Sequence, residues 1–212
     1  MKQNYTHLVL LIDRSGSMRT IKNDMEGGLK TFLDKQRLEP GTCTITAAQF
    51  DSEYEILYNR VSIKEINEIK IDPRGSTALI DSMARLIGEV GRDLDSIPED
   101  EKPDRVLFIT VTDGEENSSV EFTNVDLKNL IKEQEEKWNW NFTYIGANQD
   151  AFSAAARFGG KMSNSMNYLA SKRGIDKMWD KVSDATSRYR SIENNNITPN
   201  SFAYTKDEQE DI

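Results

Sequence analysis

The sequence predicts one α/β domain with a Rossmann-like, doubly wound sheet in three layers, mostly parallel, with one antiparallel edge strand. Two continuous apolar runs, residues 6–12 and 105–112, each lead into an aspartate, and such runs are typical of strands buried on both faces of a parallel sheet. Stretches with helical periodicity separate these runs, which is the pattern of βαβ units. Two β-rich stretches, residues 42–50 and 54–58, follow one another closely and predict the hairpin that supplies the antiparallel strand.

The first half of the chain alternates strand and helix patterns. After the strand at 6–12, residues 19–37 predict a helix because their apolar side chains recur every three or four positions. Pro40 and the glycine after it end that helix, and a second long helix follows the hairpin, from about residue 77 to 95. The apolar positions that define the two helices are Ile21, Met25, Leu29, Phe32, Leu33, Leu79, Ile80, Met83, Leu86, Ile87 and Val90.

The second half continues the alternation and ends in a long helix. The stretch 159–169 is ambiguous, and a short strand is one interpretation of it. In chain order, the other predicted elements are a strand at 105–112, a helix at about 123–137, a strand at 140–145, a short Ala-rich helix at 149–158 and a final helix at 171–190.

Length and charge divide the chain into a domain at residues 1–190 and a tail at 191–212. The 212 residues are enough for one α/β domain with a short extension. The tail is polar and acidic, so we expect it to pack poorly. Its charged side chains are Glu193, Lys206, Asp207, Glu208, Glu210 and Asp211.

Composition excludes several classes of protein. The net charge of −9 disfavours nucleic acid as a partner, because phosphate-backbone binders carry a basic excess. The longest apolar run, residues 8–12, is too short for a membrane span or a signal peptide, so we expect a cytoplasmic protein. One cysteine and one histidine, Cys43 and His7, rule out an internal disulfide, a cysteine-based zinc cluster and any site with two histidines.

The strongest chemical signal is a D-x-S-x-S turn directly after the first strand. In a tight turn, the alternate side chains of Asp13, Ser15 and Ser17 can point toward one centre. One carboxylate and two hydroxyls are hard oxygen ligands, which suit Mg²⁺ or Mn²⁺ rather than zinc or copper. The alternative interpretation is an ordinary strand-to-helix turn in which Ser17 caps the next helix.

Two further loops add oxygen ligands. Thr77 lies in a Gly-Ser-Thr segment at the start of the second long helix, and Asp113 lies in a Thr-Asp-Gly segment just past the strand at 105–112. Read alone, these segments are a helix cap and an Asp-Gly turn. Together with the first turn, however, they converge on the edge formed by the carboxyl ends of the parallel strands, where α/β folds bind ligands.

With these three segments the sequence resembles a von Willebrand factor type A domain that has a complete metal-ion-dependent adhesion site, of the bacterial or phage intracellular type. The resemblance covers roughly residues 5–190, and the segment 144–151 also resembles the fifth strand and following turn of bacterial and phage members. It implies that Ser15 and Ser17 bind the metal directly and that Thr77 does so when a ligand is present. It also implies that Asp13 and Asp113 act mostly through bound water.

The resemblance implies a protein–protein interaction module rather than an enzyme. Neutral hydroxyls leave the charge of a bound cation poorly neutralised, so the ion gains from an exposed Asp or Glu of a protein partner. We expect an intracellular scaffold or assembly factor. The acidic tail could occupy a neighbouring molecule's site and so cause self-association.

Five charged residues beside the motifs are candidates for partner binding. Arg14, Arg19 and Arg74 would attract and orient an acidic partner if they face the site. Glu115 and Glu116 oppose that field and would select which partner is tolerated. The alternative is that they are ordinary solvated loop residues.

Two other functions remain as alternatives. A metal-dependent hydrolase with an aspartate nucleophile would need a second acid two positions after Asp13, where this chain has Ser15, and there is no P-loop. The second alternative is a purely structural domain with a vestigial site, and a test of metal binding distinguishes it from an interaction module.

Overall fold

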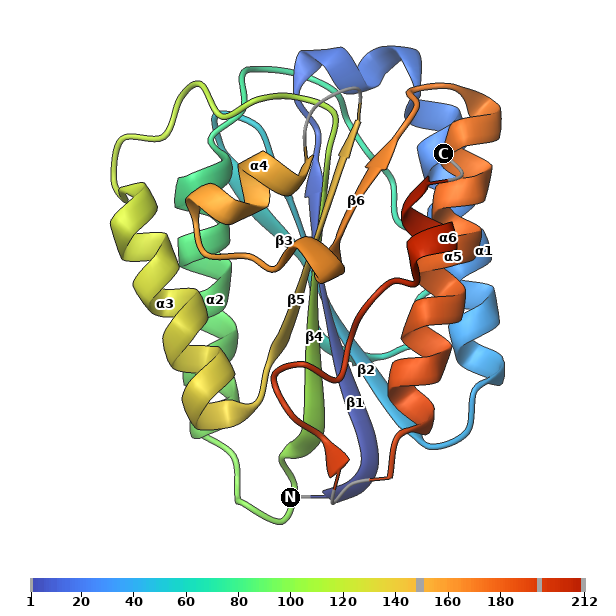
Figure 1. Cartoon of the computed structure of the whole chain (residues 1–212), viewed down its shortest axis with the longest axis vertical. Coiled ribbons are helices and arrows are strands. Elements are labelled where there is room, and N and C mark those ends of the chain that lie inside the picture. The colour runs from blue at the N-terminus through green and yellow to red at the C-terminus, as the bar shows by residue number, and fades with distance from the viewer. Residues whose placement is uncertain (1, 148–150, 194–195, 211–212) are drawn as a thin grey trace.

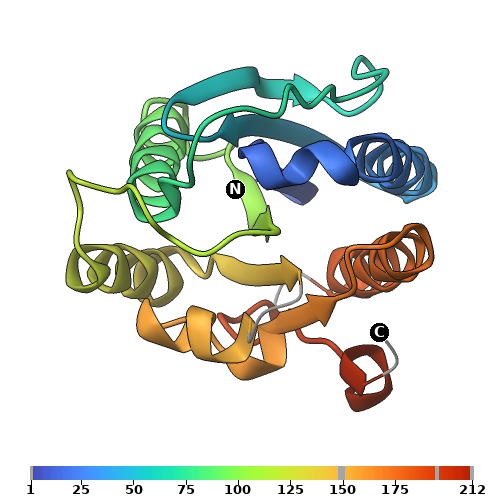
Figure 2. The same cartoon turned by 90° about the horizontal axis from the view of Figure 1, so that it is seen from above.

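The predicted α/β fold is confirmed by a computed structural model that describes residues 2–147, 151–193 and 196–210. The described residues form a sheet of six strands in the order β3-β2-β1-β4-β5-β6, with helices on both faces (Figures 1 and 2). The strands are β1 (Lys2–Asp13), β2 (Thr42–Phe50), β3 (Tyr54–Ser62), β4 (Pro103–Thr112), β5 (Asn141–Ala147) and β6 (Ser165–Tyr168).

The pairing is parallel everywhere except at one edge. β1 lies at the centre between β2 and β4, and β5 and β6 continue the parallel order. β3 pairs antiparallel with β2, which is the predicted hairpin. The ambiguous stretch 159–169 contains β6, and this short strand forms the second edge of the sheet.

Helices cover the sheet in two groups. α1 (Lys22–Leu38) and α5 (Lys172–Ser191) pack on one face, and α2, α3 and α4 pack on the other (Figure 2). β1 shows why this arrangement forms: Leu8, Leu10 and Ile12 point to the first group, and Val9 and Leu11 point to the second. The second group is α2 (Leu79–Asp95), α3 (Asn124–Trp138) and α4 (Ala151–Arg157).

Two differences concern helix bounds. The predicted helix at 19–37 is a short 3₁₀ helix, η1 (Gly16–Thr20), followed by α1. The predicted helix at 149–158 begins at Ala151 in the structure, and its first two positions lie outside the described residues, as does part of the segment 144–151.

The tail is the largest correction. Phe202 and Tyr204 are 1% and 5% exposed and belong to the core on the α1–α5 face, so the expectation of poor packing is wrong for the described part of the tail. The segment ends in a short helix, α6 (Lys206–Glu210), where the Glu208 carboxylate accepts hydrogen bonds from both terminal nitrogens of Arg188 at 2.8 and 2.7 Å. The tail packs because its two aromatic rings fill space in the core beside α5.

Among the described helices, none combines the length and the apolar character that crossing a membrane requires.

Candidate metal centre

The D-x-S-x-S segment forms a tight turn at the carboxyl end of β1. The N–H of Ser15 donates to Asp13 Oδ1 at 2.6 Å, which folds the chain back over the aspartate. The N–H of Arg14 donates to the carbonyl oxygen of Phe50 on β2, at 2.7 Å, and the N–H of Gly16 donates to that of Gly75, at 3.2 Å. The turn is thereby fixed to the neighbouring strand and to the loop that carries Thr77.

The hydroxyls of the turn meet the aspartate after β4. Ser15 Oγ and Ser17 Oγ lie 3.0 Å apart, and Ser17 Oγ donates to Asp113 Oδ1 at 2.7 Å. Because β1 and β4 are adjacent parallel strands, Asp13 and Asp113 both lie at the same edge of the sheet. Three of the predicted residues are thus in direct contact.

Thr77 reaches the same place from the loop before α2. A Cβ built on Gly114 would lie 3.1 Å from Thr77 Oγ1 and 3.8 Å from both Ser15 Oγ and Asp13 Oδ2. The bare glycine therefore leaves a small space bordered by oxygen atoms from three segments. All five predicted ligands, Asp13, Ser15, Ser17, Thr77 and Asp113, come together around it.

The carboxylates of the site are held by neutral donors. Asp13 is fully buried, and its Oδ2 accepts from Thr112 Oγ1 at 2.5 Å. Burial raises the pKa of Asp13 to about 6, against the lowering effect of its hydrogen bonds to Thr112 and Ser15. Partial burial also raises the pKa of Asp113, and the hydrogen bond from Ser17 opposes the shift. The site therefore concentrates negative charge that its own hydrogen bonds do not neutralise.

This donor set fits a hard divalent cation. Carboxylate and hydroxyl oxygens suit Mg²⁺ or Mn²⁺, and two poorly neutralised carboxylates favour a positive ion. Across the described ranges, no group of three or more His, Cys, Asp or Glu side chains is placed to hold a metal. The candidate centre differs from such a group because three of its five ligands, Ser15, Ser17 and Thr77, are hydroxyls.

The structure corrects the role expected for Arg14. Its side chain is buried beneath the turn, where it forms ion pairs with Asp51 at 3.3 Å and with Glu55 at 2.5 Å. It cannot meet a partner at the surface, and it instead joins the turn to the hairpin. Arg74 is half exposed and pairs with Asp51 at 2.9 Å and Glu53 at 2.5 Å.

Glu115 is exposed beside the site, whereas its neighbour Glu116 has a structural role in place of the expected partner-selecting one. The Glu116 carboxylate accepts from the N–H of Ile80 at 2.9 Å and from the N–H of Ser119 at 2.7 Å. It thus caps α2 and fixes the loop that carries Asp113. An acid after a Thr-Asp-Gly turn is the only signal in the sequence, and it does not distinguish a cap from a solvated charge.

Asp81 holds the other end of the same loop. Its carboxylate accepts from the N–H groups of Val120 at 2.8 Å, Glu121 at 3.1 Å and Phe122 at 2.8 Å. Three backbone donors around one buried carboxylate make the loop rigid. The sequence does not indicate this role either, because an acid in the first turn of a helix is ordinary.

Solved structures with the same architecture have low sequence identity to this chain. Proximal thread matrix protein 1 from the mussel byssus aligns with a TM-score of 0.62 at 13% identity, over 88% of this chain and 48% of the other. Another structure of that protein, with a zinc-occupied MIDAS motif, aligns with a TM-score of 0.57 at 14% identity, over 87% and 46%. A von Willebrand factor type A structure from Catenulispora acidiphila aligns with a TM-score of 0.54 at 16% identity, over 86% and 43%.

The fold is that of a von Willebrand factor type A domain. The ArnB paralog VWA2 from Sulfolobus acidocaldarius supports this, with a TM-score of 0.55 at 18% identity over 87% of this chain and 45% of the other. The chain spans less than half the length of each of these structures. Its sequence matches no protein-family model and no curated protein.

Proposed function

We propose that this von Willebrand factor type A domain is a metal-dependent protein–protein interaction module of the bacterial or phage intracellular type. Mg²⁺ or Mn²⁺ would be held by Ser15, Ser17 and Thr77, with Asp13 and Asp113 acting mostly through water. The partner would be a protein with an exposed Asp or Glu. The module would serve as a scaffold or assembly factor and would catalyse no reaction.

The contact between Ser15, Ser17 and Asp113 carries this proposal. The two hydroxyls lie 3.0 Å apart, and the second donates to Asp113 at 2.7 Å, so the three groups already form one array. When bound there, the cation supplies an electrophilic centre that attracts an external carboxylate. Neutral hydroxyls neutralise little of its charge, which leaves most of the attraction for the partner.

The rigid frame around the array supports binding of a partner. Asp81 and Glu116 hold the loop of Asp113, and the ion pairs of the buried Arg14 side chain hold the turn of Ser15. A site fixed in this way loses little conformational entropy when a partner docks. The zinc-occupied MIDAS of the mussel protein gives a precedent for metal in this fold.

The first test is thermal unfolding in excess chelator and then in Mg²⁺ or Mn²⁺. At ten times the dissociation constant, binding should add about 1.4 kcal/mol, or roughly 3–5 °C in Tm. Ser17→Ala should abolish the shift, because it removes one exposed ligand and disturbs little packing. Ser76→Ala is the matched control, since Ser76 is exposed beside Thr77 and is not a proposed ligand.

The second test concerns the partner. Wild-type protein and the Ser17→Ala variant are used to capture proteins from the source cell extract, with and without chelator. A partner held by wild type in metal, and lost both in chelator and with Ser17→Ala, supports the proposal. Absence of any metal-dependent shift in the first test, with the variants folded, would overturn it.

A further inference from the structure

A second candidate site lies at the opposite end of the sheet. A cavity of about 410 Å³ opens between α2 and α3, at the amino ends of β4 and β5. Asp13 and Asp113 lie at the carboxyl ends of their strands, so the two sites are separated by the length of the sheet (Figure 1). Pockets of roughly 300–1,000 Å³ are typical of small-molecule sites.

Two glycines of α2 create the hollow. Gly88 and Gly91 line the cavity one helical turn apart. A Cβ on Gly91 would have Gln134 Nε2 as its nearest neighbour, at 3.9 Å, and a Cβ on Gly88 would have Arg92 Nη1, at 3.6 Å. Larger side chains would therefore fit at both positions, and each glycine costs the helix about 1 kcal/mol relative to alanine. Close packing does not explain why these positions are glycine, whereas an open cavity requires small residues here.

Aromatic rings form the opposite wall. Trp138, the last residue of α3, is 44% exposed, and Trp140 is 3% exposed just before β5. Lys102 Nζ lies 5.7 Å from the centroid of the Trp138 ring. Together with the apolar side chains of Ile87 and Leu94, the indoles give the cavity flat apolar surfaces that suit a planar molecule.

Three basic and two acidic side chains line the cavity, which leaves one positive charge in excess. Lys102 pairs with Glu99 at 3.2 Å and with Asp95 at 3.9 Å, and Arg105 pairs with Asp104 at 2.8 Å. Arg92 is exposed at the cavity and forms no ion pair with any of the described residues. Its guanidinium is therefore the lining cation whose charge remains open to a ligand, and it offers the paired donors that carboxylates and sulfonates bind.

We propose that this cavity binds a small aromatic anion, with the ring between the two indoles and α2 and the acidic group on Arg92. The proposal concerns a different part of the molecule from the metal centre and does not depend on it. It also departs from the rule that α/β folds bind ligands at the carboxyl ends of their strands.

The probe is anilinonaphthalene sulfonate, an aromatic anion that fluoresces when it enters an apolar site. Its neutral counterpart, phenylnaphthylamine, has the same rings without the sulfonate. Gly91→Leu should fill the cavity and weaken binding of both dyes by at least about tenfold. Gly27→Leu is the matched control, because a Cβ on Gly27 in α1 meets nothing within 4 Å. It should leave binding unchanged.

The charge is tested separately. Arg92→Gln should weaken binding of the sulfonate by about tenfold and leave the neutral dye unaffected. Arg85→Gln is its control, since Arg85 lies on the same helix and pairs with Glu121 instead of lining the cavity. Neither chelator nor the Ser17→Ala change should alter binding, which separates this site from the metal centre.

Three results would overturn the proposal. One is that the folded wild-type protein binds neither dye at millimolar concentration. Another is that Gly91→Leu, shown to be folded by circular dichroism, binds the sulfonate as tightly as wild type. The third is that Arg92→Gln weakens both dyes equally or neither, which contradicts the role of the guanidinium even if Gly91→Leu does not fold.

Discussion

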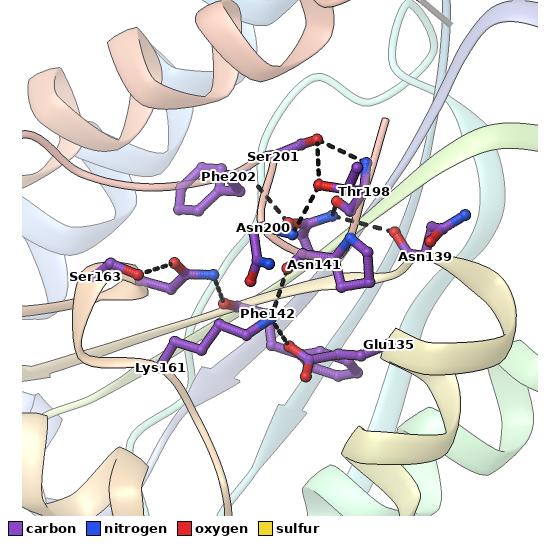
Figure 3. A network of polar contacts seen from close by, with 12 residues as sticks. Glu135, Asn139, Asn141, Phe142, Lys161, Ser163, Thr198, Asn200, Ser201 and Phe202 are labelled. Carbon is purple, nitrogen blue, oxygen red and sulfur yellow. Dashed lines mark hydrogen bonds and ion pairs between the residues drawn. The ribbon is translucent and has the colours of Figure 1, made fainter. Parts of the chain in front are cut away.

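Asn141, the first residue of β5, accepts a hydrogen bond at its Oδ1 from the backbone N–H of Phe202 at 3.0 Å, which fixes the C-terminal segment to the sheet (Figure 3). The other half of the same amide, Nδ2, donates to the carbonyl oxygen of Thr198 at 3.0 Å. Lys161 Nζ adds a contact to the carbonyl oxygen of Pro199 at 2.6 Å and pairs with Glu135 at 2.7 Å. The segment is thus part of the domain rather than an appendage.

Asn141→Leu should lower the free energy of unfolding by roughly 2–4 kcal/mol, because it leaves the buried N–H of Phe202 without an acceptor and removes the donor to the Thr198 carbonyl. The measurement is urea unfolding, together with hydrogen exchange over residues 196–210, which should become faster. Thr143→Val is the control: it removes only the 2.9 Å hydrogen bond to the Tyr204 hydroxyl and should cost about 1 kcal/mol. Equal losses of unfolding free energy for the two variants would argue against a special role of the two Asn141 hydrogen bonds in holding the C-terminal segment.

The sequence contains a signal for this packing in β5. β5 reads as alternating polar and aromatic residues, and its polar side chains, Asn141 and Thr143, are buried. In a strand covered on both faces, such positions need polar partners. The tail supplies them from a segment whose two aromatic residues, Phe202 and Tyr204, are separated by one position. The acidic composition of the tail concealed that pattern.

The fold and the assembly of the five candidate oxygen ligands were predictable because they rest on local patterns. Continuous apolar runs identify parallel strands, and each motif directly follows a strand or precedes a helix, so topology alone brings the motifs to one edge. The role of Arg14 was not predictable. Its partners, Asp51 and Glu55, come from a hairpin about forty residues away, and no local pattern joins them to the turn.

Two adjacent glycines of α1 should respond in opposite ways to alanine. A Cβ on Gly28 would lie 2.0 Å from Trp179 Cδ1 on α5, so Gly28→Ala should destabilise the protein by about 1–3 kcal/mol. A Cβ on Gly27 would meet nothing within 4 Å, so Gly27→Ala should stabilise the protein by up to about 1 kcal/mol. Chemical unfolding of both variants checks this, and effects of the same sign would contradict the packing of α1 on α5.

His7 should stay neutral in the native protein at all mildly acidic pH values. It is fully buried, with Nδ1 2.8 Å from Thr44 Oγ1 and Nε2 3.2 Å from Thr46 Oγ1. Burial, and then the charge of Arg60, lower its pKa to about 3. The imidazole of the unfolded chain binds a proton near pH 6.5, whereas that of the native protein does not. The contribution of His7 to the free energy of unfolding is therefore complete above pH 6.5, and it falls by about 1.4 kcal/mol per pH unit as pH falls toward 3.

The chain has one histidine, so proton NMR of untagged protein gives a single imidazole signal to follow. The signal should not shift between pH 8 and the onset of acid unfolding. A native signal that titrates near pH 6.5 would show that the imidazole is accessible to protons and would contradict its burial.

In excess chelator, Asp13→Asn should be more stable than wild type at neutral pH. The folded pKa of Asp13 is about 6 and its ordinary value is 3.8, so the folded state binds more protons than the unfolded state between these values. Stability from this group is therefore greatest below about pH 4 and falls as pH rises through 6, by about 3 kcal/mol in all. Asparagine carries no charge and escapes the loss, so the two proteins should converge near pH 4.

Thermal unfolding at pH 4, 5, 6 and 7 measures the difference in stability between wild type and Asp13→Asn. If that difference does not change with pH, the Asp13 carboxylate is not buried without a compensating charge, which contradicts the prediction. Added Mg²⁺ should then narrow the difference at pH 7, and reverse it above roughly 200 times its dissociation constant, because the proposed cation stabilises wild type through the same charge that destabilises it in chelator. Asp24→Asn is the control. Asp24 lies in the first turn of α1 and is not a proposed ligand, so the difference of this variant from wild type should change with neither chelator nor metal.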